Sequence, residues 1–121
     1  MQTNKKTDIQ KHVDSIADDL TNPKELDQEY IDDYLDPDCY QPGDVISGYD
    51  YLNDALDIQY IVSGNKEYLG ARVLVSFGGP NIWINTLNNT IEGYWWADSA
   101  FASFEDNIGL NDALCELWYC S

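Results

Sequence analysis

Aspartate and glutamate recur every few residues between positions 25 and 57, a stretch that contains no lysine or arginine. Clustered carboxylates can exchange protons with a substrate, coordinate calcium, or present negative charge to a basic surface. Proton transfer needs two carboxyl groups whose pKa values a pocket has separated, and no pair stands out among the 22 acidic residues. Asp36-Pro37-Asp38 resembles part of a calcium loop but lacks the D-x-[DN]-x-[DN]-G spacing and the distal glutamate. The pattern therefore favours the third chemistry, the presentation of negative charge.

The residue types that most enzymes use for catalysis are few and scattered in this chain. His12 is the only histidine, and Cys39, Cys115 and Cys120 form no C-x-x-C pair. The sequence also lacks a P-loop, a G-x-G-x-x-G turn, an H-E-x-x-H helix and a nucleophile elbow. We therefore predict no enzymatic activity, no catalytic residue, no cofactor and no metal site.

The balance of charges limits the kinds of partner that the chain can have. With 22 acidic and six basic residues the formal net charge is −16, so the surface carries a strongly negative field. Nucleic-acid phosphates and anionic membrane surfaces are recognised mainly by lysine and arginine, and this field opposes both. We expect neither direct nucleic-acid binding nor membrane binding.

The expected compartment follows from the N-terminus and the cysteines. The first ten residues hold two lysines without an apolar segment after them, and no stretch approaches the roughly 18 apolar residues of a membrane span. Three cysteines without a pairing pattern suit a reducing compartment. We expect a cytoplasmic protein.

Length and composition predict one domain, residues 1–121, of the α+β class. The 121 residues are 44% hydrophobic and 13% aromatic, which is enough for one core and argues against disorder. Residues 1–6 are expected to be frayed at the terminus. Residues 7–57 are expected to form N-terminal acidic helices, and residues 58–121 a sheet with a C-terminal helix.

Helical spacing and capping residues predict three helices in the first half. The first begins after Thr7, whose side chain can cap it. The second is predicted over 23–35, with Asn22 as its N-cap and a proline at its first position. The third is predicted over 48–56, with Ser47 as its cap. The apolar positions of the first helix are Ile9, Val13, Ile16, Ala17 and Leu20.

The second half changes from helical to alternating periodicity, which is typical of strands. Four strands are predicted, at 58–62, 69–77, 81–86 and 90–96. Their short connections favour a four-stranded antiparallel meander, because parallel neighbours need a crossover of about a dozen residues. A closing helix is predicted over 108–118.

The predicted helices place their acids in stripes. One arc of the second helix carries Glu29, Asp32, Asp33 and Asp36, Asp38 follows in the loop, and a second stripe carries Asp50, Asp54 and Asp57. The tyrosines and leucines between these acids are assigned to packing. Helical neighbours three or four residues apart lie about 5–6 Å from each other, and duplex phosphates advance about 3.4 Å per strand. The stripes could therefore imitate a phosphate backbone, or they could be ordinary solvated faces.

Aromatic residues at the end of the fourth predicted strand are candidate anchors for a partner. Alternation places Tyr94 and Trp96 on one face and Trp95 on the other. If that face is open, the two rings provide the large side chains that interface hot spots favour. The alternative is that helices cover both faces of the sheet.

Small size, acidity, acidic helices and the lack of catalytic motifs give the chain a resemblance to the DNA-mimicking inhibitors of phages and plasmids, the anti-CRISPR and anti-restriction proteins. The resemblance covers the acidic helical half, through residues that include Glu29, Asp32, Asp36, Asp50 and Asp54. It implies a basic nucleic-acid-binding partner, a CRISPR effector complex or a restriction enzyme, met in the cytoplasm of the host cell. The predicted partner-binding residues are Glu29, Asp32, Asp33, Asp36, Asp38, Asp50, Asp54, Asp57, Tyr94 and Trp96.

Two alternatives account for the same acidity. An immunity protein that neutralises a basic nuclease toxin would have one cognate partner and no effect on defence systems. A halophilic housekeeping domain would use its acids for stability in salt and for nothing else.

Overall fold

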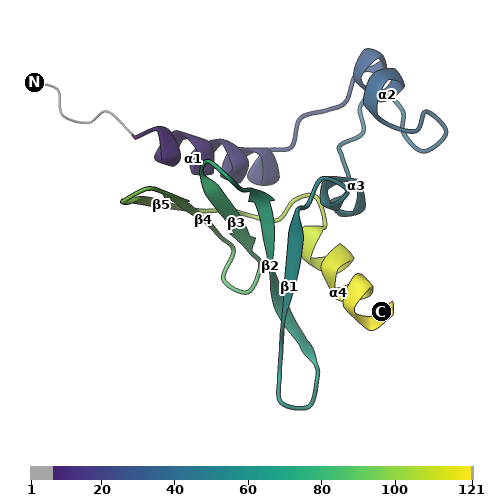
Figure 1. Cartoon of the computed structure of the whole chain (residues 1–121). Coiled ribbons are helices and arrows are strands. Elements are labelled where there is room, and N and C mark those ends of the chain that lie inside the picture. Colours follow the sequence, from purple (N-terminus) through teal and green to yellow (C-terminus); the bar gives the residue numbers. More distant parts are fainter. Residues whose placement is uncertain (1–6, 121) are drawn as a thin grey trace, which may run out of the picture.

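The computed structural model describes residues 7–120, so the segment 1–6 that was expected to be frayed lies outside the described residues. The fold is α+β, as predicted (Figure 1). The elements in chain order are α1 (Asp8–Thr21), α2 (Gln28–Tyr34), α3 (Gly48–Leu52), β1 (Asp57–Val62), β2 (Tyr68–Ser76), β3 (Asn81–Asn85), β4 (Thr90–Trp95), β5 (Asp98–Ser103) and α4 (Leu110–Cys120).

The sheet is an antiparallel meander of five strands in the order β1-β2-β3-β4-β5, so the predicted count of four is wrong. The missed strand, β5, has the sequence DSAFAS, whose small residues have low strand propensity. It forms because the hairpin pairs it with β4 along its whole length, from Trp95 opposite Asp98 to Thr90 opposite Ser103. Tertiary pairing therefore decides the conformation of this segment.

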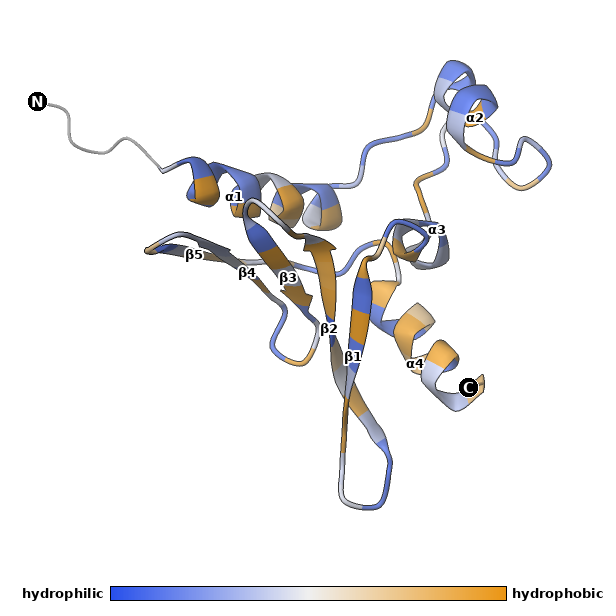
Figure 2. Ribbon diagram, in the orientation of Figure 1, coloured by the Kyte–Doolittle hydropathy of each residue, from blue (hydrophilic) through white to orange (hydrophobic). Residues whose placement is uncertain are grey.

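One face of the sheet is covered by α1 and α4, and the core lies between. The register puts Ile82, Gly93 and Ala100 side by side on this face. A Cβ atom at Gly93 would lie 2.6 Å from Val13 Cγ1, so α1 packs directly onto the sheet there. Figure 2 shows the apolar stripe of α1 turned toward the strands.

The α1 prediction is confirmed in its cap and in its buried face. The Thr7 hydroxyl accepts a hydrogen bond from the Gln10 N–H at 3.2 Å. Ile9, Val13, Ala17 and Leu20 are buried. At the other end of the same sheet face, the Tyr60 ring on β1 contacts Trp118 of α4, with the ring centroids 5.3 Å apart.

The second helix begins at Gln28, not at Pro23, and the residue that caps it is Asp27, whose carboxylate accepts the Tyr30 N–H at 2.8 Å. The Leu26 backbone is paired instead with the segment after the helix: its N–H donates to Asp44 O at 2.7 Å, and its C=O accepts from Gly43 N at 3.0 Å. This pairing ties residues 22–45 into a unit that we call the α2 lobe.

The α2 lobe protrudes from the body of the molecule (Figure 1). Ile31 is fully buried but stands outside the main core cluster. Tyr30 and Tyr34, which were predicted to pack, are 42% and 73% exposed. Their rings contact each other at an interplanar angle of 42°, with the centroids 4.9 Å apart. The lobe therefore contributes surface to the molecule more than it contributes core.

The third helix is shorter than predicted and ends at Leu52, although Ser47 does cap it. Leu52 is buried, whereas Tyr49 and Leu56, predicted to face inward, are exposed. Leu56 lies outside the helix. Its N–H donates to the C=O of Leu74 on β2 at 2.8 Å, one residue before β1 begins.

Helix α4 begins at Leu110 because the Asp106 carboxylate caps it. Its two oxygens accept the N–H groups of Leu110 at 2.8 Å and Asn111 at 2.7 Å. Leu110 and Leu114 are buried, whereas Leu117 is exposed. None of the helices within residues 7–120 has the length and apolar character needed to cross a membrane.

Candidate acidic binding surface

The predicted acids of the second helix face solvent on the α2 lobe. Glu29, Asp32 and Asp33 are exposed on α2, and Asp36 and Asp38 are exposed in the loop that follows. No basic residue lies between positions 25 and 57, and none of these acids forms an ion pair with another described residue. The lobe therefore presents an excess of negative charge, because Lys24 is its single basic residue.

Asp36 also organises the backbone that carries it. Its carboxylate accepts the Asp38 N–H at 2.9 Å and the Cys39 thiol at 3.6 Å. The hydrogen bond and the charge of Asp36 raise the pKa of the Cys39 thiol, so this exposed cysteine is held in its protonated form.

The predicted stripe of Asp50, Asp54 and Asp57 does not form, because α3 ends before the last two. Asp50 is half-buried, and its carboxylate accepts hydrogen bonds from the hydroxyl groups of Tyr40 and Ser47. Asp57 opens β1 and accepts the Ile58 N–H at 2.9 Å. The two predicted stripes are therefore not equivalent, and the exposed charge is concentrated on the lobe.

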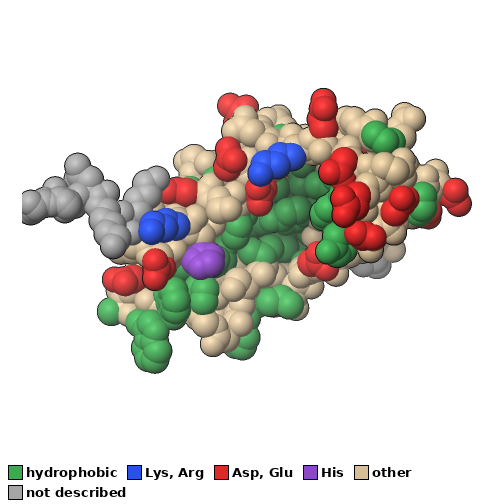
Figure 3. Space-filling view, turned by 90° about the horizontal axis from the view of Figure 1, so that it is seen from above, with side chains coloured by type: hydrophobic (Ala, Val, Ile, Leu, Met, Phe, Trp, Pro, Cys, Tyr) green, Lys and Arg blue, Asp and Glu red, His purple; other side chains and the backbone are tan. Residues whose placement is uncertain are grey.

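Asp54 lies instead at a pocket of about 590 Å³ between the α2 lobe and the body. Figure 3 shows this region as a hollow with hydrophobic side chains at its base and acidic side chains along its edge. The apolar lining consists of Ile16, Pro23, Leu26, Ile46, Val75 and Ile108. The polar lining consists of Asp19, Lys24, Glu25, Asp27, Tyr30, Tyr51 and Asp54.

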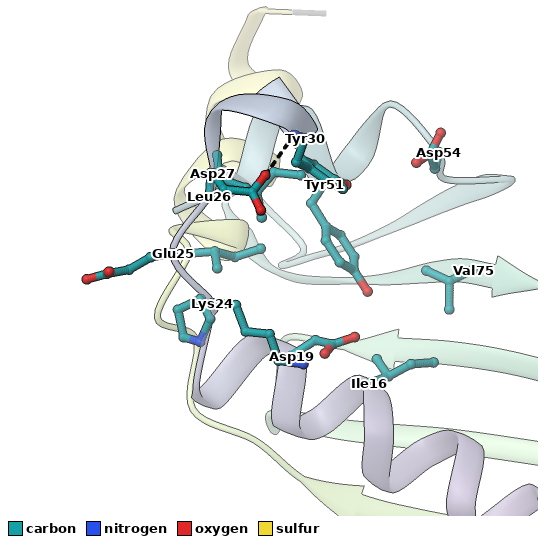
Figure 4. A pocket seen from close by; sticks show the side chains of 13 residues that line it. Ile16, Asp19, Lys24, Glu25, Leu26, Asp27, Tyr30, Tyr51, Asp54 and Val75 are labelled. Atoms are coloured by element: carbon teal, nitrogen blue, oxygen red, sulfur yellow. Dashed lines mark hydrogen bonds between the residues drawn. The ribbon is translucent and has the colours of Figure 1, made fainter. Parts of the chain in front are cut away.

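The pocket walls come from elements distant in sequence (Figure 4). Asp19 stands on α1, Tyr51 reaches down from α3, and Val75 comes from β2. Burial raises the pKa of Asp19, an effect that Lys24 opposes and Asp18 reinforces. Burial also raises the pKa of Tyr51 to about 12, and the charges of Asp19 and Asp54 act in the same direction.

The sheet face opposite α1 and α4 carries exposed side chains, such as Tyr94 and Phe101, beside the buried Leu74 and Asn85. The register places its side chains in rows that comprise Gln59, Arg72, Leu74, Trp83, Asn85, Glu92, Tyr94 and Phe101. We call these residues the uncovered sheet face. The guanidinium of Arg72 lies 3.0 Å from Glu92 and 4.4 Å from the Trp83 ring centroid.

Tyr94 lies on the uncovered sheet face, on the side opposite Trp95, as the alternation of side chains along the strand predicted. It contacts Phe101 edge to face, with the centroids 6.0 Å apart. The prediction that Trp96 joins it there is wrong, because β4 ends at Trp95. Trp96 occupies the turn between β4 and β5, with φ of +57°, and is 94% exposed. A bulky residue rarely adopts this left-handed conformation.

Of the predicted partner-binding residues, only Asp54 belongs to the pocket, and sequence reasoning missed Asp19, Glu25 and Asp27 there. Asp27 carried a detectable signal, because an aspartate three residues before Tyr30 can cap a helix that starts between them. Asp19 and Glu25 carried none, since only the fold brings them close to Asp54. Within residues 7–120, no group of three or more His, Cys, Asp or Glu is arranged to hold a metal ion.

Comparison of the chain with protein-family models, with curated proteins and with solved structures found no match.

Proposed function

We propose that the protein inhibits a nucleic-acid-binding defence protein, a CRISPR effector complex or a restriction enzyme, by occupying its basic nucleic-acid channel. The observation that carries the proposal is a set of exposed acids on one protruding lobe, in a stretch without any basic residue. These acids are Glu29, Asp32, Asp33, Asp36 and Asp38.

The physical basis is the substitution of carboxylates for phosphates. A nucleic-acid channel holds lysine and arginine side chains that gain affinity by releasing counterions from phosphates. Asp32 and Asp33 follow Glu29 by three and four residues on α2, so the Cβ atom of each lies about 5–6 Å from that of Glu29. Carboxylates at this density attract the same cationic side chains, which gives fast association and affinity that falls with salt.

The like charges on α2 destabilise the helix, and a basic partner would remove this repulsion. Like charges at helical spacings of three and four destabilise a helix by roughly 0.2–0.5 kcal/mol per pair. Basic side chains of a bound protein would turn this repulsion into attraction. The protrusion of the lobe supports the same conclusion, because a protruding element can enter a channel that the body of the protein cannot.

The test uses immobilised protein and a panel of purified restriction endonucleases and CRISPR effector complexes, with duplex DNA as competitor at rising salt. The lobe variant Glu29→Gln/Asp32→Asn/Asp33→Asn/Asp38→Asn removes four exposed charges. It spares Asp27 and Asp36, whose carboxylates accept backbone N–H groups, and Asp50, whose carboxylate accepts the hydroxyl groups of Tyr40 and Ser47. The control variant removes four charges elsewhere: Glu67→Gln, Asp98→Asn, Glu105→Gln and Asp112→Asn, all exposed.

We expect a panel member to bind, to be displaced by DNA and to lose its cleavage activity. The lobe variant should bind at least about tenfold more weakly, which corresponds to about 1.4 kcal/mol, and the control variant within about twofold of the wild type. The proposal is wrong if no panel member binds, or if both variants bind like the wild type. Tight binding of a single nuclease toxin would identify the immunity alternative, and a change in salt-dependent stability alone would identify the halophilic one.

A further inference from the structure

The pocket between the α2 lobe and the body combines two properties that call for one kind of ligand. Its lining includes aliphatic side chains, among them Ile16, Ile46 and Val75, which we call the aliphatic base. Its volume of about 590 Å³ falls in the ordinary range of small-ligand sites, roughly 300–1,000 Å³. An aliphatic surface of this kind gains free energy when an apolar group displaces the water above it.

The polar lining of the pocket determines the charge of that ligand. The lining includes four acidic residues, Asp19, Glu25, Asp27 and Asp54, and one basic residue, Lys24. The Glu25 side chain points away from the other labelled residues (Figure 4), so Asp27 is the acid that the lobe turns to the pocket. No ion pair joins any of these acids to another described residue. An anionic group would therefore be repelled, and a cation entering beside the apolar base would find carboxylates on both walls.

The two walls carry their acids on different parts of the molecule. Glu25 and Asp27 belong to the α2 lobe, whereas Asp19 and Asp54 belong to the body. A neutral apolar ligand would leave both sets of carboxylates unpaired, and a purely cationic ligand would leave the aliphatic base wet. Tyr30 and Tyr51 line the same space, and aromatic rings favour the approach of ammonium and guanidinium groups.

We propose that this pocket takes a segment of a protein partner in which an apolar side chain is flanked by lysine or arginine. The apolar side chain sits on the aliphatic base, and the flanking cations reach the carboxylates of the two walls. The inference rests on the proposed function, because the same basic nucleic-acid-binding protein supplies the segment. It adds a specific anchor to a surface that would otherwise recognise charge alone.

The probe is the peptide acetyl-Gly-Lys-Leu-Arg-Gly-amide, titrated into isotope-labelled full-length protein and followed by NMR. Two matched peptides separate the contributions: acetyl-Gly-Lys-Gly-Arg-Gly-amide keeps the charge, and acetyl-Gly-Gln-Leu-Gln-Gly-amide keeps the apolar side chain. We expect the first peptide to shift the methyl signals of Ile16, Ile46 and Val75, and both matched peptides to bind at least about fivefold more weakly. The cation should also lower the pKa of Asp19, since a positive charge favours the ionised carboxyl group.

A pair of variants with equal charge distinguishes the pocket from the general field. Asp19→Asn/Asp54→Asn should weaken the first peptide at least about fivefold, whereas Glu67→Gln/Asp98→Asn, at exposed positions outside the pocket and the lobe, should leave it within about twofold. Equal binding of the Lys-Gly-Arg peptide, shifts spread over α2 instead of the pocket, or equal effects of the two variants would each overturn the proposal.

The peptide titration tests the pocket proposal separately from the effector-binding test of the proposed function. If a panel effector is captured through the lobe acids but the first peptide does not bind in the pocket, the inhibitor proposal stands and the pocket proposal is overturned. If the peptide binds in the pocket but no effector is captured, the inhibitor proposal fails and the pocket remains a site for a basic, apolar segment of another protein.

Discussion

The α2 lobe and the uncovered sheet face handle their acids in opposite ways. On the sheet face, the Glu92 carboxylate is held by Arg72 at 3.0 Å, by the Asn85 side-chain amide at 3.0 Å and by the Tyr94 hydroxyl at 3.3 Å. On the lobe, the exposed carboxylates have no cation among the described residues as an ion-pair partner. A carboxylate that supports structure is thus enclosed by donors, and carboxylates that the structure leaves open are available to a partner.

The largest expected effect on stability comes from breaking the network on the sheet face. Arg72→Ala should lower the free energy of unfolding by about 2 kcal/mol, because Glu92, whose side chain is only 14% exposed, loses its cation. Urea denaturation measures the change. Arg72→Lys serves as the control that keeps the charge, and it should recover part of the loss. If Arg72→Ala leaves the free energy of unfolding unchanged, Glu92 has no structural role and does not differ in this respect from the lobe acids.

Alkaline pH tests the acids around the pocket. The folded-state pKa of Tyr51 is about 12, above its unfolded value of about 10. The stability linked to this group is therefore complete below pH 10 and is lost as the pH rises toward 12. We expect on the order of 1–2 kcal/mol of loss in the wild type and a flatter profile in Tyr51→Phe, measured by urea denaturation from pH 9 to 12. Parallel profiles would show that Tyr51 is not enclosed beside Asp19.

Substitution of Trp96, in the turn between β4 and β5, should change the stability by a smaller amount. Its φ of +57° is strained for a side chain with a Cβ, and its ring is 94% exposed, so little burial offsets the strain. Trp96→Gly should stabilise the protein by about 0.5 kcal/mol, whereas Trp96→Ala, which keeps the Cβ, should leave stability nearly unchanged. Thermal and urea denaturation measure both. Destabilisation by Trp96→Gly would mean that the ring has a packing role.

Neutralising the lobe should have the smallest effect on stability, and of opposite sign to Arg72→Ala. Asp32 and Asp33 lie in the last turn of α2, where negative charge is unfavourable for the helix dipole. Asp32→Asn/Asp33→Asn should therefore stabilise α2 by up to about 0.5 kcal/mol at low salt and by less at high salt. Hydrogen exchange of the Leu35 amide, which donates to Ile31 O at 2.9 Å, reports on this helix directly. Faster exchange in the variant would show that these acids support the lobe.

Local sequence signals predicted the elements whose residues interact with near neighbours. The capped, periodic helix α1 and strands β1 to β4 follow from spacing alone. The start of α2 was misplaced because Asn22-Pro23 has the form of a helix start, while the Leu26 backbone is paired with Gly43 and Asp44. That pairing is tertiary, and no local pattern records it.

The candidate site was predictable to the same extent. Exposed acids on α2 follow from composition and periodicity, and Glu29, Asp32 and Asp33 are exposed. The pocket could not be predicted, because its lining residues, among them Asp19, Glu25 and Asp54, come from segments that only the tertiary fold brings to one cavity. The exposure of Tyr30 and Tyr34 was missed for a related reason: a helix of seven residues on a protruding lobe has too small a core to bury both rings.

The most direct test of phosphate mimicry is the salt dependence of effector binding by the lobe variant and the control variant. We predict that the wild type and the control variant lose affinity steeply as salt rises, as a nucleic acid does. The lobe variant should bind at least about tenfold more weakly at low salt and lose less affinity with salt, because fewer charged contacts remain. Equal affinities and equal salt dependence for all three proteins would contradict phosphate mimicry by the lobe acids.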